Sequence, residues 1–160
     1  MSGLLVTVCL VYFLFAATTY VGTLWCLHFF LYPTWVGLTP DNVGVHFVGP
    51  TRAATRFFTY VVPPMFVTGP VMVAAAWGDP VVIAPVLAVL GIIVSTYVGQ
   101  RLIIPVNKRI AAGVTSQELT PLLKRWMRYN DIRWVTTSIM WAATVWYAVA
   151  EGNLIHVLGS

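Results

Sequence analysis

Four long stretches without a charged residue constrain this 160-residue chain more than any other feature. No Asp, Glu, Lys or Arg occurs within residues 1–40, 57–78, 80–100 or 134–150. A helix needs about 20 predominantly apolar residues to cross a bilayer. Only 9% of the residues are charged, whereas a soluble domain has about 25%. The sequence therefore predicts an all-α integral membrane protein.

The predicted architecture is a single transmembrane domain over residues 1–160, folded as a four-helix bundle. A short amphipathic helix is expected before the fourth span, beginning either at a capping box of Thr115 and Glu118 or at Thr120-Pro121. The fourth uncharged run has 17 residues and is short for a span, but the side chain of Arg133 can extend toward the headgroups. The spans are expected at about 4–32, 57–77, 81–104 and 132–150.

The placement of the basic residues predicts an orientation. All nine lie in two segments, before the second span and between the third and the fourth. The positive-inside rule then makes 33–56 and 105–131 cytoplasmic loops and leaves both termini outside the cell membrane. The net charge of +4 is accounted for by topology and anionic lipid headgroups, so nucleic acid is not an expected partner.

Two polar residues interrupt an apolar helical stripe near the start of the fourth span. Winding the segment at about 100° per residue places Asn130 and Arg133 on the face of Leu119, Leu123 and Trp126. An ionisable group on the bundle side of a membrane helix is by default a functional-site hypothesis. Candidate partners of Arg133 are Asp41, a backbone carbonyl, a lipid phosphate or a bound ligand. Arg133 extending to phosphate, with Asn130 capping a kink, is the open alternative. The opposite, solvated face is expected to carry Lys124, Arg125, Arg128 and Asp131.

The second and third spans carry polar or helix-breaking residues of their own. Thr96, Gln100, Ile103 and Asn107 share one face of an ideal helix, which predicts either a polar strip toward the cytoplasm or ordinary interhelical hydrogen bonds. The second span contains three prolines, which predict either freed carbonyls that line a cavity or a simple kink. These prolines are Pro63, Pro64 and Pro70.

Two histidines lie near the membrane boundary and are candidate functional residues. Trp25, His28 and Tyr32 lie on one face of the first span, and His46 follows in the connecting segment. Membership of an interfacial aromatic belt is the alternative for His28. Two histidines without a carboxylate cluster do not predict a metal site, and no haem-attachment motif is present. No cofactor is identified.

Two short motifs resemble a family of small bacterial and fungal membrane proteins, first defined as a domain of unknown function, that includes the anthrone oxygenases. The motifs are IIPVNKRI, residues 103–110, and WMRYNDIR, residues 126–133. The segments WCLHFFLYP and VHFVGPTRAATRF are similar to a subgroup with a histidine in each. The resemblance implies a four-helix membrane bundle. The positions that match the signature are Pro105, Val106, Asn107, Trp126, Asn130 and Arg133.

The resemblance implies oxidation of an apolar phenolic or polyketide substrate in a pocket near the cytoplasmic face, without an obvious cofactor. Two other functions stay open: a non-enzymatic subunit or assembly factor of a larger membrane complex, and a carrier of a lipophilic molecule. Expected partners are membrane lipids, an apolar aromatic small molecule, and copies of the chain or a larger complex. The predicted catalytic residues are His28, His46, Asn130 and Arg133, and the predicted substrate-binding residues are Trp25, Gln100, Asn107 and Trp126.

Overall fold

The computed structural model describes residues 3–151, which form helices and no strands. This part of the chain contains seven α-helices: α1 (Gly3–Cys26), α2 (Tyr32–Trp35), α3 (Gly49–Val61), α4 (Met65–Ala75), α5 (Ile83–Val98), α6 (Ile104–Ala111) and α7 (Ser116–Glu151). Short segments of other helix types join several of them: π-helical Leu27–Leu31, Gly44–Val48 and Gly99–Ile103, and 3₁₀-helical Pro80–Val82.

The π-helical segments make long continuous rods out of shorter helices. Gly3–Trp35 and Pro80–Ala111 are each long and apolar enough to cross a membrane. Gly44–Val61 and Met65–Ala75 would add a third span if this pair, bent by 43°, crosses as one unit. Pro63 and Pro64 account for the break, because proline has no N–H to continue the helical hydrogen bonds. These two or three helices indicate a membrane protein.

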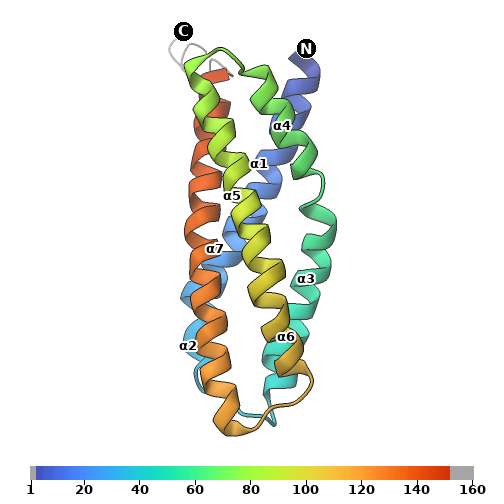
Figure 1. The fold of residues 1–160 in the computed structure, drawn as a ribbon, viewed down its shortest axis with the longest axis vertical. Coiled ribbons are helices and arrows are strands. Elements are labelled where there is room, and N and C mark those ends of the chain that lie inside the picture. The colour runs from blue at the N-terminus through green and yellow to red at the C-terminus, as the bar shows by residue number, and fades with distance from the viewer. Residues whose placement is uncertain (1–2, 152–160) are drawn as a thin grey trace.

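The rods pack side by side as an elongated bundle (Figure 1). α1 and α5 each contact both α4 and α7, so these four helices close a ring. The turn between α4 and α5 is tight: Gly78 has a φ of 93°, and the Asp79 carboxylate accepts a hydrogen bond from the Val81 N–H. The end where α7 begins is formed by α2, α6 and their connections (Figure 1).

The last helix, α7, differs from the prediction. The separate amphipathic helix expected before residue 132 is not present, because α7 runs without a break through Ser116–Glu151. Its one proline, Pro121, is the sixth residue of the helix and lacks the N–H that would bond to the Gln117 carbonyl, but α7 continues through it. At about 1.5 Å per residue this 36-residue helix is about 54 Å long. It is therefore longer than the hydrocarbon layer of a bilayer, which is about 30 Å thick.

The predicted loops 33–56 and 105–131 are also largely helical. α2, α3, α6 and the first half of α7 fall within them. α2, α6 and the first half of α7 bury apolar residues against one another, whereas the one buried residue of α3 is Thr51. Charge frequency alone therefore underestimated how far the helices extend.

Two separate hydrophobic clusters hold the bundle together. One fills the half that contains both described chain ends, and α5 and α7 approach so closely there that a Cβ on Gly91 would lie 2.6 Å from the Met140 Cβ. The other lies at the α2–α6 end and is built around Trp35, Phe47 and Trp126, whose rings have centroids 5.0–5.4 Å apart.

α3 spans the region between these clusters and is fixed at both ends. Phe47, just before α3, is fully buried in the second cluster. At the other end Phe58 packs on the Tyr20 ring with centroids 4.6 Å apart, and the Tyr12 hydroxyl donates to the Val61 carbonyl at 2.9 Å. Between its ends α3 stands away from α5 and α7 (Figure 1).

Candidate functional site

A cavity of about 480 Å³ lies under α3. Its lining residues come from α1, α3, α4, α7 and the rod made by α5 and α6, so every rod of the bundle contributes to it. Exposed side chains at its edge, including Cys26, Thr59 and Gln100, show that it communicates with the surface of the bundle. Its volume falls in the range of about 300–1,000 Å³ that is usual for small-molecule sites.

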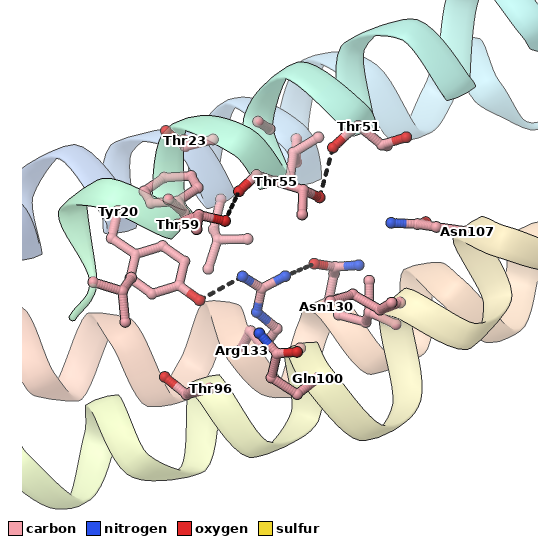
Figure 2. A pocket seen from close by; sticks show the side chains of 18 of the residues that line it. Tyr20, Thr23, Thr51, Thr55, Thr59, Thr96, Gln100, Asn107, Asn130 and Arg133 are labelled. Carbon is pink, nitrogen blue, oxygen red and sulfur yellow. Dashed lines mark hydrogen bonds between the residues drawn. The ribbon is translucent and has the colours of Figure 1, made fainter.

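Asn130 and Arg133 of α7 point into this cavity (Figure 2). Asn130 is fully buried and donates to the Trp126 carbonyl at 3.1 Å. Arg133 donates one terminal N–H to the Asn130 carbonyl oxygen at 2.9 Å and another to the Tyr20 hydroxyl. Its guanidinium is therefore held by two neutral acceptors. The predicted inward orientation of both side chains is confirmed.

The rod of α5 and α6 supplies a polar wall beside Arg133. Thr96, Gln100 and Asn107 all line the cavity, as the helical-face prediction requires. The Asn107 carbonyl oxygen accepts a hydrogen bond from Trp126 Nε1 at 2.6 Å, so its amide nitrogen is directed into the cavity (Figure 2). The Thr96 hydroxyl is buried and has no hydrogen-bond partner.

α3 presents a row of threonines on the opposite side of the cavity (Figure 2). Thr51, Thr55 and Thr59 follow one another at intervals of four residues and line the cavity. Each hydroxyl donates to the carbonyl four residues earlier, at 2.7, 2.8 and 2.9 Å. In this arrangement their protons are directed to the backbone of α3. Each hydroxyl oxygen keeps lone pairs that can accept a further hydrogen bond.

The cavity brings together five of the eight predicted site residues, namely Gln100, Asn107, Trp126, Asn130 and Arg133. Trp25, His28 and His46 do not line it. Trp25 is 47% exposed and donates to the Ser138 hydroxyl at 3.1 Å, and His46 is exposed on the segment before α3. Helical periodicity placed Trp25 and His28 on one face, but it could not show which neighbouring helix that face meets. None of the eight functional roles is tested by this geometry.

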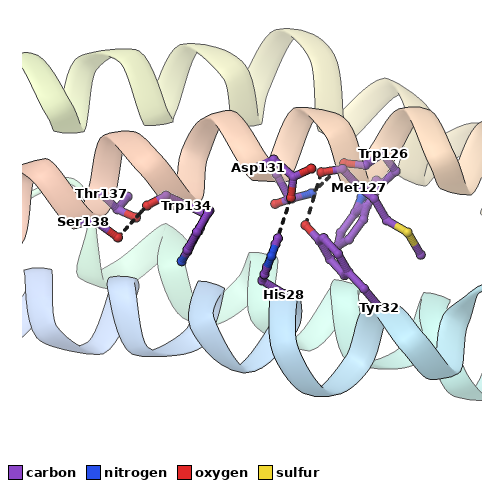
Figure 3. A network of polar contacts seen from close by, with 9 residues as sticks. His28, Tyr32, Trp126, Met127, Asp131, Trp134, Thr137 and Ser138 are labelled. Carbon is purple, nitrogen blue, oxygen red and sulfur yellow. Dashed lines mark hydrogen bonds and ion pairs between the residues drawn. The ribbon is translucent and has the colours of Figure 1, made fainter.

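The seam between α1 and α7 holds His28 instead (Figure 3). His28 Nδ1 lies 3.0 Å from an Asp131 carboxylate oxygen, and its ring stacks on Trp134 with centroids 4.4 Å apart. The Tyr32 hydroxyl donates to the Met127 carbonyl at 3.2 Å in the same seam. Asp131 was predicted on the solvated face of α7, and its side chain is 45% exposed, but the Leu27–Leu31 segment packs beside it and brings His28 to its carboxylate.

Sequence reasoning missed two components of the cavity. Tyr20 holds Arg133 and also accepts a hydrogen bond from Ser95 at 3.1 Å, whereas Asp41 had been considered as the arginine's partner. The threonine row was recognisable as three threonines spaced by four residues in an otherwise mixed helix. Tyr20 carried no such signal, because it is one aromatic residue within a long apolar run.

The charged groups of the described residues do not form a metal site. No group of three or more His, Cys, Asp or Glu side chains comes together within residues 3–151. The pKa of Glu118, at the start of α7, is lowered chiefly by a hydrogen bond from the Thr115 N–H, with further contributions from the Thr115 hydroxyl and Arg109. This arrangement belongs to the helix start and lies outside the cavity lining.

Comparison with known proteins gives no family assignment. No family model matches the chain, and neither a curated protein nor a solved structure is significantly similar to it. The resemblance carried by Asn107, Trp126, Asn130 and Arg133 therefore stays a prediction.

Proposed function

We propose that this chain is a small multi-pass membrane enzyme that binds an apolar phenolic molecule in the cavity and oxidises it with molecular oxygen. The observation that carries the proposal is the Arg133 guanidinium, which faces a largely apolar cavity between helices. An ionisable group at such a position is costly unless it serves a ligand or finds a partner. The resemblance to the anthrone oxygenase family supplies the reaction class.

The membrane arrangement is part of the proposal. All four rods would cross the membrane, with the apolar half of α7, residues 132–150, as the fourth span. The basic end of the bundle would be cytoplasmic and both termini outside, following the positive-inside rule. The cavity then lies near the cytoplasmic headgroups, where an apolar substrate dissolved in the bilayer can reach it.

The chemistry needs no external reductant. Oxidation of an anthrone methylene to a carbonyl breaks two C–H bonds and the O–O bond, places one oxygen on carbon and releases the other as water. The substrate supplies all four electrons. Arg133, held by Asn130, would stabilise the phenolate or enolate that reacts with oxygen, in the manner of an oxyanion hole. His28 and His46 do not line the cavity, so ionisation would depend on Arg133 favouring the anion rather than on a histidine base.

Binding without turnover is a second candidate, and a specific observation favours it. Among the described residues the cavity lining contains no His, Asp, Glu or Lys, and its remaining candidates for proton transfer are Tyr20 and Cys26. The Tyr20 hydroxyl already accepts hydrogen bonds from Arg133 and Ser95. A carrier or a ligand-binding subunit needs the cavity and Arg133 but no proton-transfer group.

Oxygen consumption separates the two candidates. The purified protein in detergent should consume oxygen when an anthrone is added, and activity should fall in Arg133→Ala but persist in Arg128→Ala. Arg128 is the matched control because it is exposed on the same helix. Anthrone binding without oxygen uptake would favour the carrier, whereas equal losses in both variants would exclude Arg133 as the specific site.

A further inference from the structure

The cavity contains a positive charge that no carboxylate balances. Arg133 is the one charged side chain among the residues that line it. Within residues 3–151 the carboxylates that contact basic side chains are Asp131, at His28, and Glu118, at Arg109, and neither of them contacts Arg133. In addition, Arg133 Nε is buried and has no hydrogen-bond partner. A cation in a low-dielectric site interacts much more strongly with an anion than with a neutral group.

The two polar walls differ in their hydrogen-bonding character. On one side Arg133 and the Asn107 amide nitrogen offer donors. On the other, the hydroxyls of Thr51, Thr55 and Thr59 already donate to backbone carbonyls, so in this arrangement each of them offers an acceptor to a ligand. A ligand that satisfies both walls therefore needs an acceptor at one edge and a donor at the other.

We propose that the cavity binds a hydroxylated aromatic monoanion, with its charged oxygen at Arg133 and a hydroxyl group against the threonine row of α3. The single uncompensated guanidinium sets the charge at minus one. The accepting threonines select a hydroxyl in preference to a methoxy group or a second anionic oxygen. The apolar remainder of the lining, including Leu24, Phe58 and Ile103, suits an aromatic body. This inference rests on the proposed ligand cavity but not on its oxygenase activity.

The test uses three matched probes with the full chain in lipid nanodiscs under nitrogen, so that turnover does not contribute. The first probe, 6-hydroxy-2-naphthoic acid, is a monoanion at neutral pH with a hydroxyl on the opposite edge. Its methyl ester keeps the hydroxyl and lacks the charge, and 6-methoxy-2-naphthoic acid keeps the charge and lacks the donor. Naphthyl fluorescence reports binding, with empty nanodiscs as the correction for partition into lipid.

The hydroxy acid should bind at least about tenfold more tightly than its ester, because a hydrogen bond to a charged group is stronger than one between neutral groups. This preference should disappear in Arg133→Gln and persist in Arg128→Gln. The hydroxy acid should also bind several-fold more tightly than the methoxy acid, and that difference should shrink in Thr55→Val, a nearly isosteric change that removes the accepting oxygen.

Several outcomes would overturn the inference. They are equal binding of acid and ester to the unmodified protein, no binding of the acid at millimolar concentration, and a loss of preference in Arg128→Gln as large as in Arg133→Gln. If Arg133→Gln does not fold, Arg133→Lys, which keeps the charge, must retain the preference for the acid. A protein that binds the acid selectively but consumes no oxygen with an anthrone would sustain this inference and refute the oxygenase proposal.

Discussion

Two polar regions lie on different sides of α7, and they differ in how their charges are balanced. On the α1 seam, Asp131 is paired with His28, and one neutral donor, Trp134 Nε1, is left without a partner. On the cavity side, Arg133 has only the neutral Asn130 and Tyr20 as partners. In the seam the Asp131 carboxylate contacts a basic side chain, whereas no carboxylate of the described residues lines the cavity beside Arg133. The comparison suggests a criterion for this protein: of the two polar helix interfaces, the one that indicates a ligand is the one where a charged side chain, Arg133, contacts neutral groups alone among the described residues.

The largest expected effect comes from supplying the missing charge within the protein. Asn130→Asp is nearly isosteric and places a carboxylate where the amide now contacts Arg133. Affinity for the hydroxynaphthoic acid should fall by about a hundredfold, because hydrogen bonds to charged groups contribute up to about 3 kcal/mol. Gln117→Glu, an equivalent change on the exposed start of α7, should leave the affinity unchanged. Fluorescence titration measures both, and unchanged affinity in Asn130→Asp would contradict the assignment of Arg133 as the anion site.

A second prediction contrasts the packed and hollow parts of the α5–α7 interface. A Cβ on Gly91 would meet the Met140 Cβ at 2.6 Å and the Thr136 carbonyl oxygen at 3.0 Å, so Gly91→Ala should destabilise the bundle by about 1–3 kcal/mol. A Cβ on Gly99 would lie 3.8 Å from Arg133 Cζ, and Gly99→Ala should be neutral or stabilising by up to about 1 kcal/mol. Denaturant unfolding in detergent measures both, and similar behaviour of the two variants would argue against the cavity.

The third prediction compares two tryptophan hydrogen bonds. Trp126→Phe leaves the Asn107 carbonyl oxygen without its donor in a region where Trp126 is 2% exposed, and should cost about 1–3 kcal/mol of unfolding free energy. Trp141→Phe removes a bond to the Thr18 hydroxyl on the exposed side of the α1 seam, and should cost less than about 1 kcal/mol. Equal losses of unfolding free energy in the two variants would show that the two tryptophan hydrogen bonds are equally shielded from water, contrary to this prediction.

The seam itself should contribute little. A double-mutant cycle with His28→Gln and Asp131→Asn should give a coupling free energy of at most about 1 kcal/mol, because the two side chains are 30% and 45% exposed. Neither change should alter the affinity for the hydroxynaphthoic acid. A large drop in affinity in either variant would connect the seam to the cavity and remove the distinction between the two regions.

The smallest effect is expected far from both regions, at the start of α7. Hydrogen bonds from Thr115 hold the pKa of Glu118 below its usual value, so its ionised form stabilises the folded state. That contribution is present above the unfolded-state pKa of about 4.3 and is lost as pH falls through the lower folded-state pKa. Melting temperatures should therefore favour the native protein over Glu118→Gln slightly at pH 7. The difference should shrink as pH falls below about 4.3 and through the lower folded-state pKa, and a difference that does not change with pH would exclude this origin.

Much of the helical organisation was available from the sequence. The uncharged runs located apolar helices, and the kink that was one alternative for Pro63 and Pro64 agrees with the 43° bend there, although the bent pair begins at Gly44 and not at residue 57. Periodicity correctly placed Trp126, Asn130 and Arg133 on the buried face of α7 and Gln100 and Asn107 on one face of the neighbouring rod. The length of α7 was not predicted, because the charged residues before residue 134 indicate where the chain meets water and do not indicate where a helix begins.

The sequence by itself determined that the chain forms apolar helices and which face of each helix turns inward, because composition and a period of 3.6 residues act locally along the chain. Only the tertiary structure decided which faces meet. It brought Tyr20 to Arg133, the threonine row of α3 across from them, and His28 to Asp131 outside the cavity. Those contacts depend on the rotation and separation of whole helices, and no local pattern encodes the hollow that α3 leaves by being fixed only at its two ends.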